Sequence, residues 1–221
     1  MSGTSTFDCV GTVVVHYRTP DLLRQTVDSF RAFYPAAELL IVDNGSPESE
    51  REMVRNLAAG NPENTKTVFL ERNIFHGPAM HLAMSVLEQE FVFFLDSDTM
   101  TRRGGFLEAM SGILSDGSEV YGVGRVGTVN KRGFHSVHGT EILFSPYMMV
   151  RRAMYVELPP FEHHGAPTMK NFSAAAKRGW RLAAFPVEES IEHLGRGTSG
   201  VFGYGLGLRG IWEHLLNKAG I

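Results

Sequence analysis

The sequence predicts an α/β fold in which a mainly parallel sheet is flanked by helices. Short apolar runs rich in β-branched and aromatic residues alternate with segments of helical periodicity through the first hundred residues. These runs are apolar throughout, which is typical of strands that helices cover on both faces. We expect a single domain over residues 8–221, because a chain of 221 residues that is 43% hydrophobic can form one substantial core.

The first strand and helix are predicted by residues 10 to 30. Val10–His16 is a β-branched run, which favours a strand. Thr19 suits the position before a helix, and Pro20 suits the first helical position. The predicted helix has an apolar stripe that consists of Leu22, Leu23, Val27 and Phe30.

Two further strand–helix units follow. Glu38–Val42 predicts the second strand, and it runs into Asp43-Asn44-Gly45-Ser46-Pro47, a segment composed of turn-forming residues. Ser49–Ala59 is helical in pattern, and Thr67–Leu70 predicts the third strand. Gly77–Glu88 predicts the helix that follows the third strand.

The fourth strand, Glu90–Leu95, ends in two carboxylates one residue apart, Asp96 and Asp98. Open α/β sheets bind ligands outside the carboxyl ends of their strands. Paired carboxylates in such a place can hold a hard cation such as Mg²⁺ or Mn²⁺. The alternative is a polar turn in which Asp98 caps a helix that begins within Thr99–Arg103.

Beyond Met100 the pattern is looser. We expect a helix at Met169–Gly179 and a strand at Arg181–Phe185. Ile211–Ala219 predicts a short amphipathic helix that packs on the core, with docking to a partner or a membrane surface as the alternative. The intervening segment is expected to contain short strands separated by glycines, namely Gly122, Gly124, Gly127, Gly133 and Gly139.

Bulk properties exclude several classes of protein. A net charge of −3 gives no reason to expect binding to nucleic acid or to an anionic membrane. The only cysteine, Cys9, cannot form an internal disulfide and fits a reducing compartment. With no signal-peptide pattern and no apolar run near the roughly 18 residues of a membrane span, we expect no transmembrane segment and a cytoplasmic location.

Four segments together carry a resemblance to a known family. They are VVVHYRTPDLL at Val13–Leu23, IVDNGSPE at Ile41–Glu48, ERNIFHGPAMHLAM at Glu71–Met84 and FLDSDT at Phe94–Thr99. In this order and spacing they resemble the nucleotide-binding half of the GT-A-fold glycosyltransferases, specifically the family-2-type inverting enzymes. The resemblance implies a GT-A-like domain that moves a sugar from a nucleotide-diphosphate sugar to an acceptor hydroxyl. Residues 8–100 would bind the donor, and residues 101–221 would form the acceptor side.

The resemblance also implies donor contacts. Asp43 is expected to read the base and Tyr17 to lie against the nucleoside. Asn73 and Gly77 resemble the family's Asn-x-Gly-type segment. Gly77 would let the backbone approach the donor, ahead of a helix whose amino terminus faces negative charge. Structural alternatives stay open, since Asp43 suits an Asx turn, Tyr17 suits packing, and Gly77 suits the start of a helix.

Two arginines are candidates for the diphosphate. Arg72 would meet phosphate, or else be a solvated surface charge. Arg196 lies in a glycine-rich stretch that would close over the diphosphate, with Arg196 binding the anion. The alternative is that this stretch is only a mobile loop.

A metal site follows from the same resemblance. Asp96 and Asp98 resemble the metal-binding Asp-x-Asp of the family. Asp98 is expected to be the principal ligand, with Asp96 assisting or reaching the ribose or a metal-bound water. His193 is expected to be the third ligand, and a surface or helix-end histidine is the alternative. The cofactor would be Mn²⁺ or Mg²⁺, which neutralises the departing diphosphate.

The catalytic base departs from the family pattern. An acidic pair is expected about a dozen residues before Gly179-Trp180, but Ala166-Pro167-Thr168 stands there. Glu162 is the first choice of base, followed by His163 and His164. A retaining mechanism, a base elsewhere in the chain, and loss of catalysis remain open.

Other functions were weighed against this interpretation. A sugar-phosphate nucleotidyltransferase of the same fold would carry a glycine-rich basic segment where His16-Tyr17-Arg18-Thr19-Pro20 stands. A non-catalytic nucleotide-binding module stays open. So do assembly into a homo-oligomer and the class of acceptor, which is a glycan, a lipid-linked molecule, a small molecule or a protein.

Overall fold

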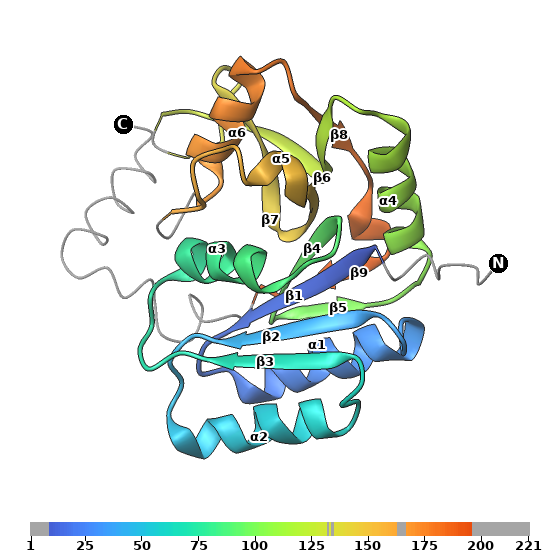
Figure 1. Cartoon of the computed structure of the whole chain (residues 1–221), viewed down its shortest axis with the longest axis vertical. Coiled ribbons are helices and arrows are strands. Elements are labelled where there is room, and N and C mark those ends of the chain that lie inside the picture. The colour runs from blue at the N-terminus through green and yellow to red at the C-terminus, as the bar shows by residue number, and fades with distance from the viewer. Residues whose placement is uncertain (1–8, 132, 134, 163–166, 196–221) are drawn as a thin grey trace.

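The structure is a computed structural model that describes residues 9–131, 133, 135–162 and 167–195 (Figure 1). The helices and strands of this part of the chain are, in order, β1 (Val10–His16), α1 (Pro20–Phe33), β2 (Glu38–Asp43), α2 (Glu48–Ala59), β3 (Thr65–Phe69), α3 (His76–Val86), β4 (Phe91–Asp96), β5 (Thr99–Thr101), α4 (Phe106–Asp116), β6 (Val120–Val129), β7 (Thr140–Arg151), α5 (Arg152–Tyr155), α6 (Met169–Lys177), β8 (Arg181–Ala184), the 3₁₀ helix η1 (Val187–Glu189) and β9 (Ile191–His193).

Seven strands form one sheet in the order β3-β2-β1-β4-β7-β6-β8. β1 pairs in parallel with β2 and with β4, and β2 pairs in parallel with β3. β8 pairs in parallel with β6. β7 is antiparallel to both of its neighbours, β4 and β6. The predicted α/β fold with a mainly parallel sheet flanked by helices is therefore confirmed.

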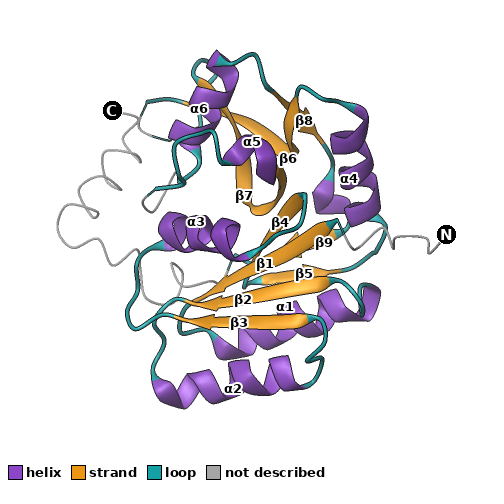
Figure 2. Ribbon diagram, viewed as in Figure 1, coloured by secondary structure: helices purple, strands orange, loops and turns teal. Residues whose placement is uncertain are grey.

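Helices cover both faces of this sheet (Figure 2). Val10 and Val14 of β1 pack with side chains of α1, α2 and α4, whereas Val13 and Val15 pack with α3, α5 and α6. Successive side chains of a strand point to opposite faces, so each strand serves two apolar layers. This double coverage explains why the strands are apolar at nearly every position.

The strand order reverses between β1 and β4. β2 and β3 extend the sheet on one side of β1, and β4 lies on its other side. At such a reversal the connections leave in opposite directions, and the crevice outside the carboxyl ends of the strands is where open α/β sheets bind ligands. Asp96 is the last residue of β4, so the Asp-x-Asp segment lies at this reversal.

The segment after β4 forms a strand instead of the alternative helix within Thr99–Arg103. The backbone nitrogen of Thr99 donates to Thr26 Oγ1 at 3.2 Å, and Thr26 Oγ1 donates to the Thr99 carbonyl at 2.9 Å. β5 then pairs with β9 in a separate two-stranded sheet.

Thr19 directly precedes α1, as expected, but its side chain makes no capping hydrogen bond.

The second half of the chain differs most from the prediction. Two long strands, β6 and β7, replace the expected short ones, and three of the glycines lie inside β6. A Cβ on Gly127 would lie 2.4 Å from Cε2 of Phe144 on β7, so the missing side chain makes room for that ring. α4 was not predicted, and Ile211–Ala219 lies outside the described residues. Among the described helices, none combines the length and apolarity that crossing a membrane requires.

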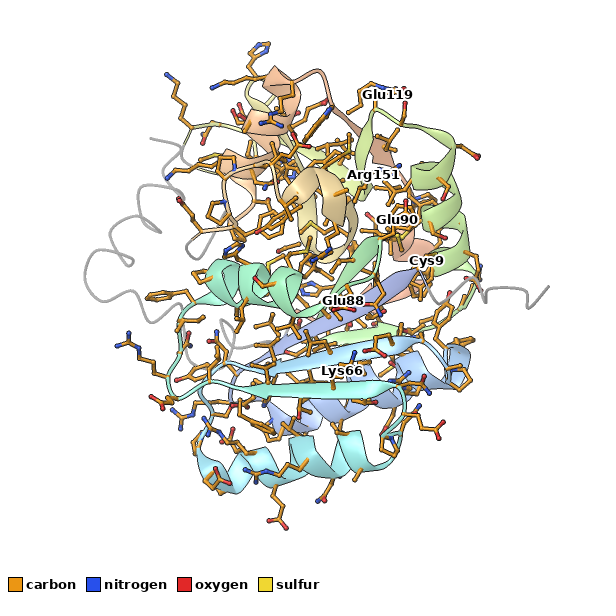
Figure 3. The ribbon with its side chains drawn as sticks, viewed as in Figure 1. Cys9, Lys66, Glu88, Glu90, Glu119 and Arg151 are labelled. Carbon is orange, nitrogen blue, oxygen red and sulfur yellow. The ribbon has the colours of Figure 1, made fainter. Side chains whose placement is uncertain are left out.

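Arg151 anchors the end of the sheet opposite the crevice (Figure 3). Its Nη1 lies 3.1 Å from Oε1 of Glu90, which precedes β4, and its guanidinium lies over the ring of Phe91. Its Nη2 donates to the carbonyl of Leu114 near the end of α4. One side chain thus ties β7, β4 and α4 together.

The start of α3 packs against the loop that precedes α6. A Cβ on Gly77 would lie 2.6 Å from both the carbonyl carbon and the carbonyl oxygen of Glu162. Backbone atoms cannot yield as a flexible side chain can, so only glycine permits this contact. The contact brings the first half of the chain against the second half beside the crevice.

We expect Gly77→Ala to destabilise the protein by about 1–3 kcal/mol, because the added methyl group overlaps the Glu162 backbone. Gly112→Ala is the matched control, since Gly112 lies within α4 and a Cβ there would meet no atom within 4 Å. That change should stabilise the protein by about 0.5–1 kcal/mol through helix propensity. Urea denaturation of both variants measures the difference, and equal effects of the two changes would contradict the packing described here.

Candidate active site

Two carboxylates and one imidazole meet where β4 ends. Asp98 lies in the turn between β4 and β5, and β5 pairs with β9 so that Thr99 lies opposite His193. The Leu194 nitrogen donates to the Asp98 carbonyl at 2.8 Å. His193 Nε2 lies 3.2 Å from Asp98 Oδ1 and 3.9 Å from Asp96 Oδ2. The strand pair therefore places His193 beside both aspartates.

The cluster is open to solvent on one side. The Asp98 side chain is 7% exposed, whereas Asp96 is 25% and His193 35% exposed. Burial raises the pKa of Asp96, and the charge of the nearby Asp98 raises it further. His76 and His193 act in the opposite direction and lower the pKa of Asp96. The hydrogen bond with Asp98 raises the pKa of His193, against the opposing effect of burial. Positive charge in this cluster is thus favourable.

These three residues fit a divalent metal ion. One ligand atom from each residue lies within 4.8 Å of those of the other two. Carboxylate oxygens and an imidazole nitrogen suit Mn²⁺, and the two carboxylates also suit Mg²⁺. The raised pKa of Asp96 reflects a negative charge that is poorly compensated, which a cation would correct.

His76 also contacts the cluster, although the sequence analysis gave it no role. It is the first residue of α3, and its Nε2 lies 3.6 Å from Asp96 Oδ1. Asp96 therefore lies between His76 and His193, with one carboxylate oxygen towards each. The position of His76 directly before Gly77 was the one signal in the sequence that it lies near the donor segment.

Asp43 is fully buried at the end of β2. Its Oδ1 accepts from the Ser46 nitrogen at 3.0 Å, which is the Asx turn considered as an alternative, and lies 3.4 Å from Arg51 Nε. Its Oδ2 is buried, lies 3.9 Å from His16 Nε2, and has no hydrogen-bond partner among the described residues. One oxygen of Asp43 thus holds the turn, and the other is left for a further donor.

His16, the last residue of β1, is buried beside Asp43. Burial lowers the pKa of His16 to about 4, although the charge of Asp43 acts in the opposite direction. Within the described part of the chain neither ring nitrogen has a hydrogen-bond partner. The ring is therefore neutral at pH 7.

The loops after β2 and β3 are joined by two asparagines. Asn73 Oδ1 accepts from Asn44 Nδ2 at 3.2 Å and from the Phe75 nitrogen at 2.7 Å. Asn44 Oδ1 accepts from the Ile74 nitrogen at 2.9 Å. Asn73 thus shapes the loop, and the adjacent Arg72 side chain is exposed.

The other residues predicted for the site lie along the same edge or outside the described residues. Tyr17 is half-buried directly after β1. Glu162 Oε2 forms an ion pair with Lys170 Nζ at 2.5 Å, and the Glu162 backbone lies against Gly77. His163, His164 and Arg196 lie outside the described residues.

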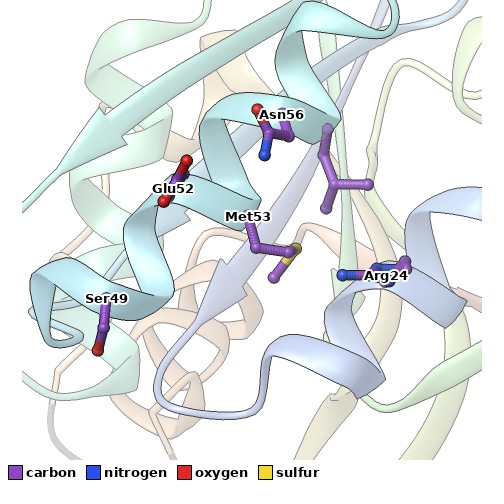
Figure 4. A pocket seen from close by; sticks show the side chains of 6 residues that line it. Arg24, Ser49, Glu52, Met53 and Asn56 are labelled. Carbon is purple, nitrogen blue, oxygen red and sulfur yellow. The ribbon is translucent and has the colours of Figure 1, made fainter.

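A separate open cavity of about 360 Å³ lies between α1 and α2 (Figure 4). It is lined by Arg24, Ser49, Glu52, Met53, Asn56 and Leu57. None of the residues predicted for the site lines it. The cavity therefore gives no support to a role in the chemistry at the end of β4.

Comparisons with known proteins agree with this fold. The model of glycosyl transferase family 2 matches residues 12–176. The mannosyltransferase PcManGT from Pyrobaculum calidifontis, in complex with GDP-Man and Mn²⁺, is similar with a TM-score of 0.66 and 19% identity, over 80% of this chain and 55% of that chain. TarS 1–349 from S. aureus, in complex with UDP-GlcNAc, is similar with a TM-score of 0.59 and 20% identity, over 84% of this chain and 60% of that chain.

These structural likenesses confirm the GT-A-like fold expected from the sequence. The chain spans only 55% and 60% of the length of these two solved chains. No curated protein sequence matches it.

The buried neutral His16 predicts an acid-dependent loss of stability. Its pKa is about 4 in the folded state and 6.5 as the ordinary value, so between these pH values the unfolded chain binds more protons. The contribution of His16 is complete above pH 6.5 and is lost as the pH falls towards 4, by up to about 3 kcal/mol. His16→Gln should flatten this dependence in urea denaturation at pH 7 and pH 4.5. The exposed His138→Gln is the control, and a flattening that is equal in both variants would contradict the prediction.

Proposed function

This chain belongs to glycosyl transferase family 2, and from that membership we propose that it transfers a sugar from a nucleotide-diphosphate sugar to an acceptor hydroxyl. The observation that carries the proposal is the cluster of Asp96, Asp98 and His193 at the strand-order reversal. PcManGT is in complex with GDP-Man and Mn²⁺, and TarS is in complex with UDP-GlcNAc, which supports a nucleotide-sugar donor.

The donor would lie along the carboxyl ends of β1, β2 and β4. Asp43 would read the base with Oδ2, the oxygen that the Asx turn does not use. Tyr17 would lie against the nucleoside. Arg72 is exposed and would meet the diphosphate together with Arg196. Asp43 would thus act from the end of β2 and Arg72 from the loop after β3, and hydrogen bonds of Asn44 and Asn73 join the loops after these two strands.

The metal site would hold Mn²⁺ or Mg²⁺ through Asp98, Asp96 and His193. A bound cation neutralises the charge that develops on the leaving diphosphate. Asp98 is the residue best fixed for this role, because it is nearly buried and its backbone carbonyl accepts from Leu194. Asp96 and His193, which are more exposed, would face the donor.

The acceptor would be activated from the second half of the chain. Glu162 is the proposed base. Its backbone lies against Gly77, the residue that follows His76, and His76 contacts Asp96. Glu162 Oε2 lies 2.5 Å from Lys170 Nζ, an ion pair that restrains the direction of the carboxylate. With such a base the reaction would invert the configuration of the sugar, whereas a retaining mechanism would need no such base.

We expect Asp98→Asn to remove the part of nucleotide affinity that depends on Mn²⁺, a loss of at least about 1.4 kcal/mol or tenfold. The amide keeps the size of the carboxylate but not its charge. Calorimetric titration of UDP and GDP with and without Mn²⁺ measures the effect, and Asp116→Asn at the exposed end of α4 is the control. Unchanged Mn²⁺ dependence in the Asp98 variant would contradict the assignment.

We expect Glu162→Gln to reduce kcat at least about a hundredfold while nucleotide affinity stays nearly constant, because the amide cannot accept the acceptor proton. Glu157→Gln is the matched control, since Glu157 also forms an exposed ion pair, with Arg178, near the same loop. Near-normal turnover in the Glu162 variant would transfer the role to His163 or His164, or to a retaining mechanism.

A further inference from the structure

We infer that His76 is a positioning residue that, when the metal site is filled, donates a hydrogen bond to one oxygen of Asp96 and so directs the other oxygen towards the metal. The inference rests on the metal site of the proposed function. It concerns a histidine to which neither the sequence motifs nor the metal-site geometry assigns a part.

The two oxygens of Asp96 face different histidines. Oδ1 lies 3.6 Å from His76 Nε2, and Oδ2 lies 3.9 Å from His193 Nε2. The group of ligand atoms that all lie within 4.8 Å of one another consists of Asp96, Asp98 and His193, and does not include His76. His76 therefore lies near Asp96 without belonging to that group of ligand atoms.

The Nε2 atom of His76 is buried and has no hydrogen-bond partner among the described residues. A buried polar nitrogen without a partner is unfavourable. The distance of 3.6 Å exceeds the usual hydrogen-bond range of about 2.7–3.2 Å by a few tenths of an ångström. A small rotation of Asp96 on metal binding would close this gap and satisfy both groups.

The backbone holds His76 in place from two sides. Phe75, the preceding residue, has φ 73° and ψ 166°, a conformation that residues with a side chain rarely adopt. Its nitrogen donates to Asn73 Oδ1, and its carbonyl accepts from Asn44 Nδ2 at 3.2 Å. On the other side Gly77 lies against the Glu162 backbone.

Strained backbone persists only where the surroundings enforce it, and it is concentrated at functional sites. Here the strain at Phe75 and the contact at Gly77 fix the residue between them. A rigid imidazole at this point can set the direction of a carboxylate whose own side chain would otherwise rotate. Groups that orient metal ligands in this way typically change metal affinity by about 10–100-fold when removed.

The test measures Mn²⁺ affinity calorimetrically, with the full chain and with UDP or GDP present. His76→Leu should weaken Mn²⁺ binding by about 10–100-fold. His76→Gln should restore most of the affinity, because its amide nitrogen can donate from a position near that of Nε2. In an Asp96→Asn background, His76→Leu should cause little further loss, because the effect of His76 passes through Asp96.

His81→Leu is the matched control. His81 lies on the same helix, and its Nδ1 lies 2.8 Å from the Tyr155 hydroxyl, so its loss lowers stability without touching Asp96. Its Mn²⁺ affinity should equal that of the unchanged protein. An equal loss of affinity in the His81 variant would show a general disturbance of α3 and overturn the inference.

Two further outcomes separate this inference from the proposed function. If the wild-type protein binds no Mn²⁺ with either nucleotide, the metal site is wrong, and so is the role of His76. If the wild-type protein and His76→Leu both bind Mn²⁺ normally, only the role of His76 is wrong. Where His76→Leu does not fold, His76→Asn replaces it, because its shorter amide cannot reach Asp96, and equal affinities of the Asn and Gln variants would overturn the inference.

Discussion

The pairing of β5 with β9 is the constraint on which the site depends. It places His193 beside two aspartates that lie almost a hundred positions earlier in the chain. The pair is held on one side by the reciprocal hydrogen bonds between Thr26 of α1 and Thr99, and on the other by Ile191, which is 1% exposed and belongs to the core. Since a buried apolar residue and a helix side chain fix the pair, the site inherits the rigidity of the core.

Charge explains why this geometry suits a cation. Burial raises the pKa of Asp96, and the charge of the nearby Asp98 raises it further. His76 and His193, each near a different oxygen of Asp96, offset part of the negative charge. The protein thus keeps negative charge concentrated where the strands end, with histidines that orient it. A divalent cation is the counter-charge that such an arrangement favours.

The sequence predicts the sheet and the two aspartates well because both depend on local patterns. Apolar runs mark the strands, and Asp96 and Asp98 follow one directly. His193 was predicted by its place in the resemblance, but its pairing with β5 is non-local and leaves no periodic signal. α4 was not predicted, although Phe106, Met110 and Leu114 recur at helical spacing. His76 and Arg51 were missed because their partners, Asp96 and Asp43, are brought to them only by folding.

The central claim is that Asp96, Asp98 and His193 bind one divalent metal ion. Anomalous diffraction from crystals grown with Mn²⁺ and UDP or GDP tests it most directly, because the manganese signal locates the ion independently of the protein. We expect one peak in contact with a carboxylate oxygen of Asp98 and a ring nitrogen of His193, with Asp96 on the same side. A manganese peak elsewhere, or one at Asp98 with His193 turned away in a complete nucleotide complex, would contradict the account.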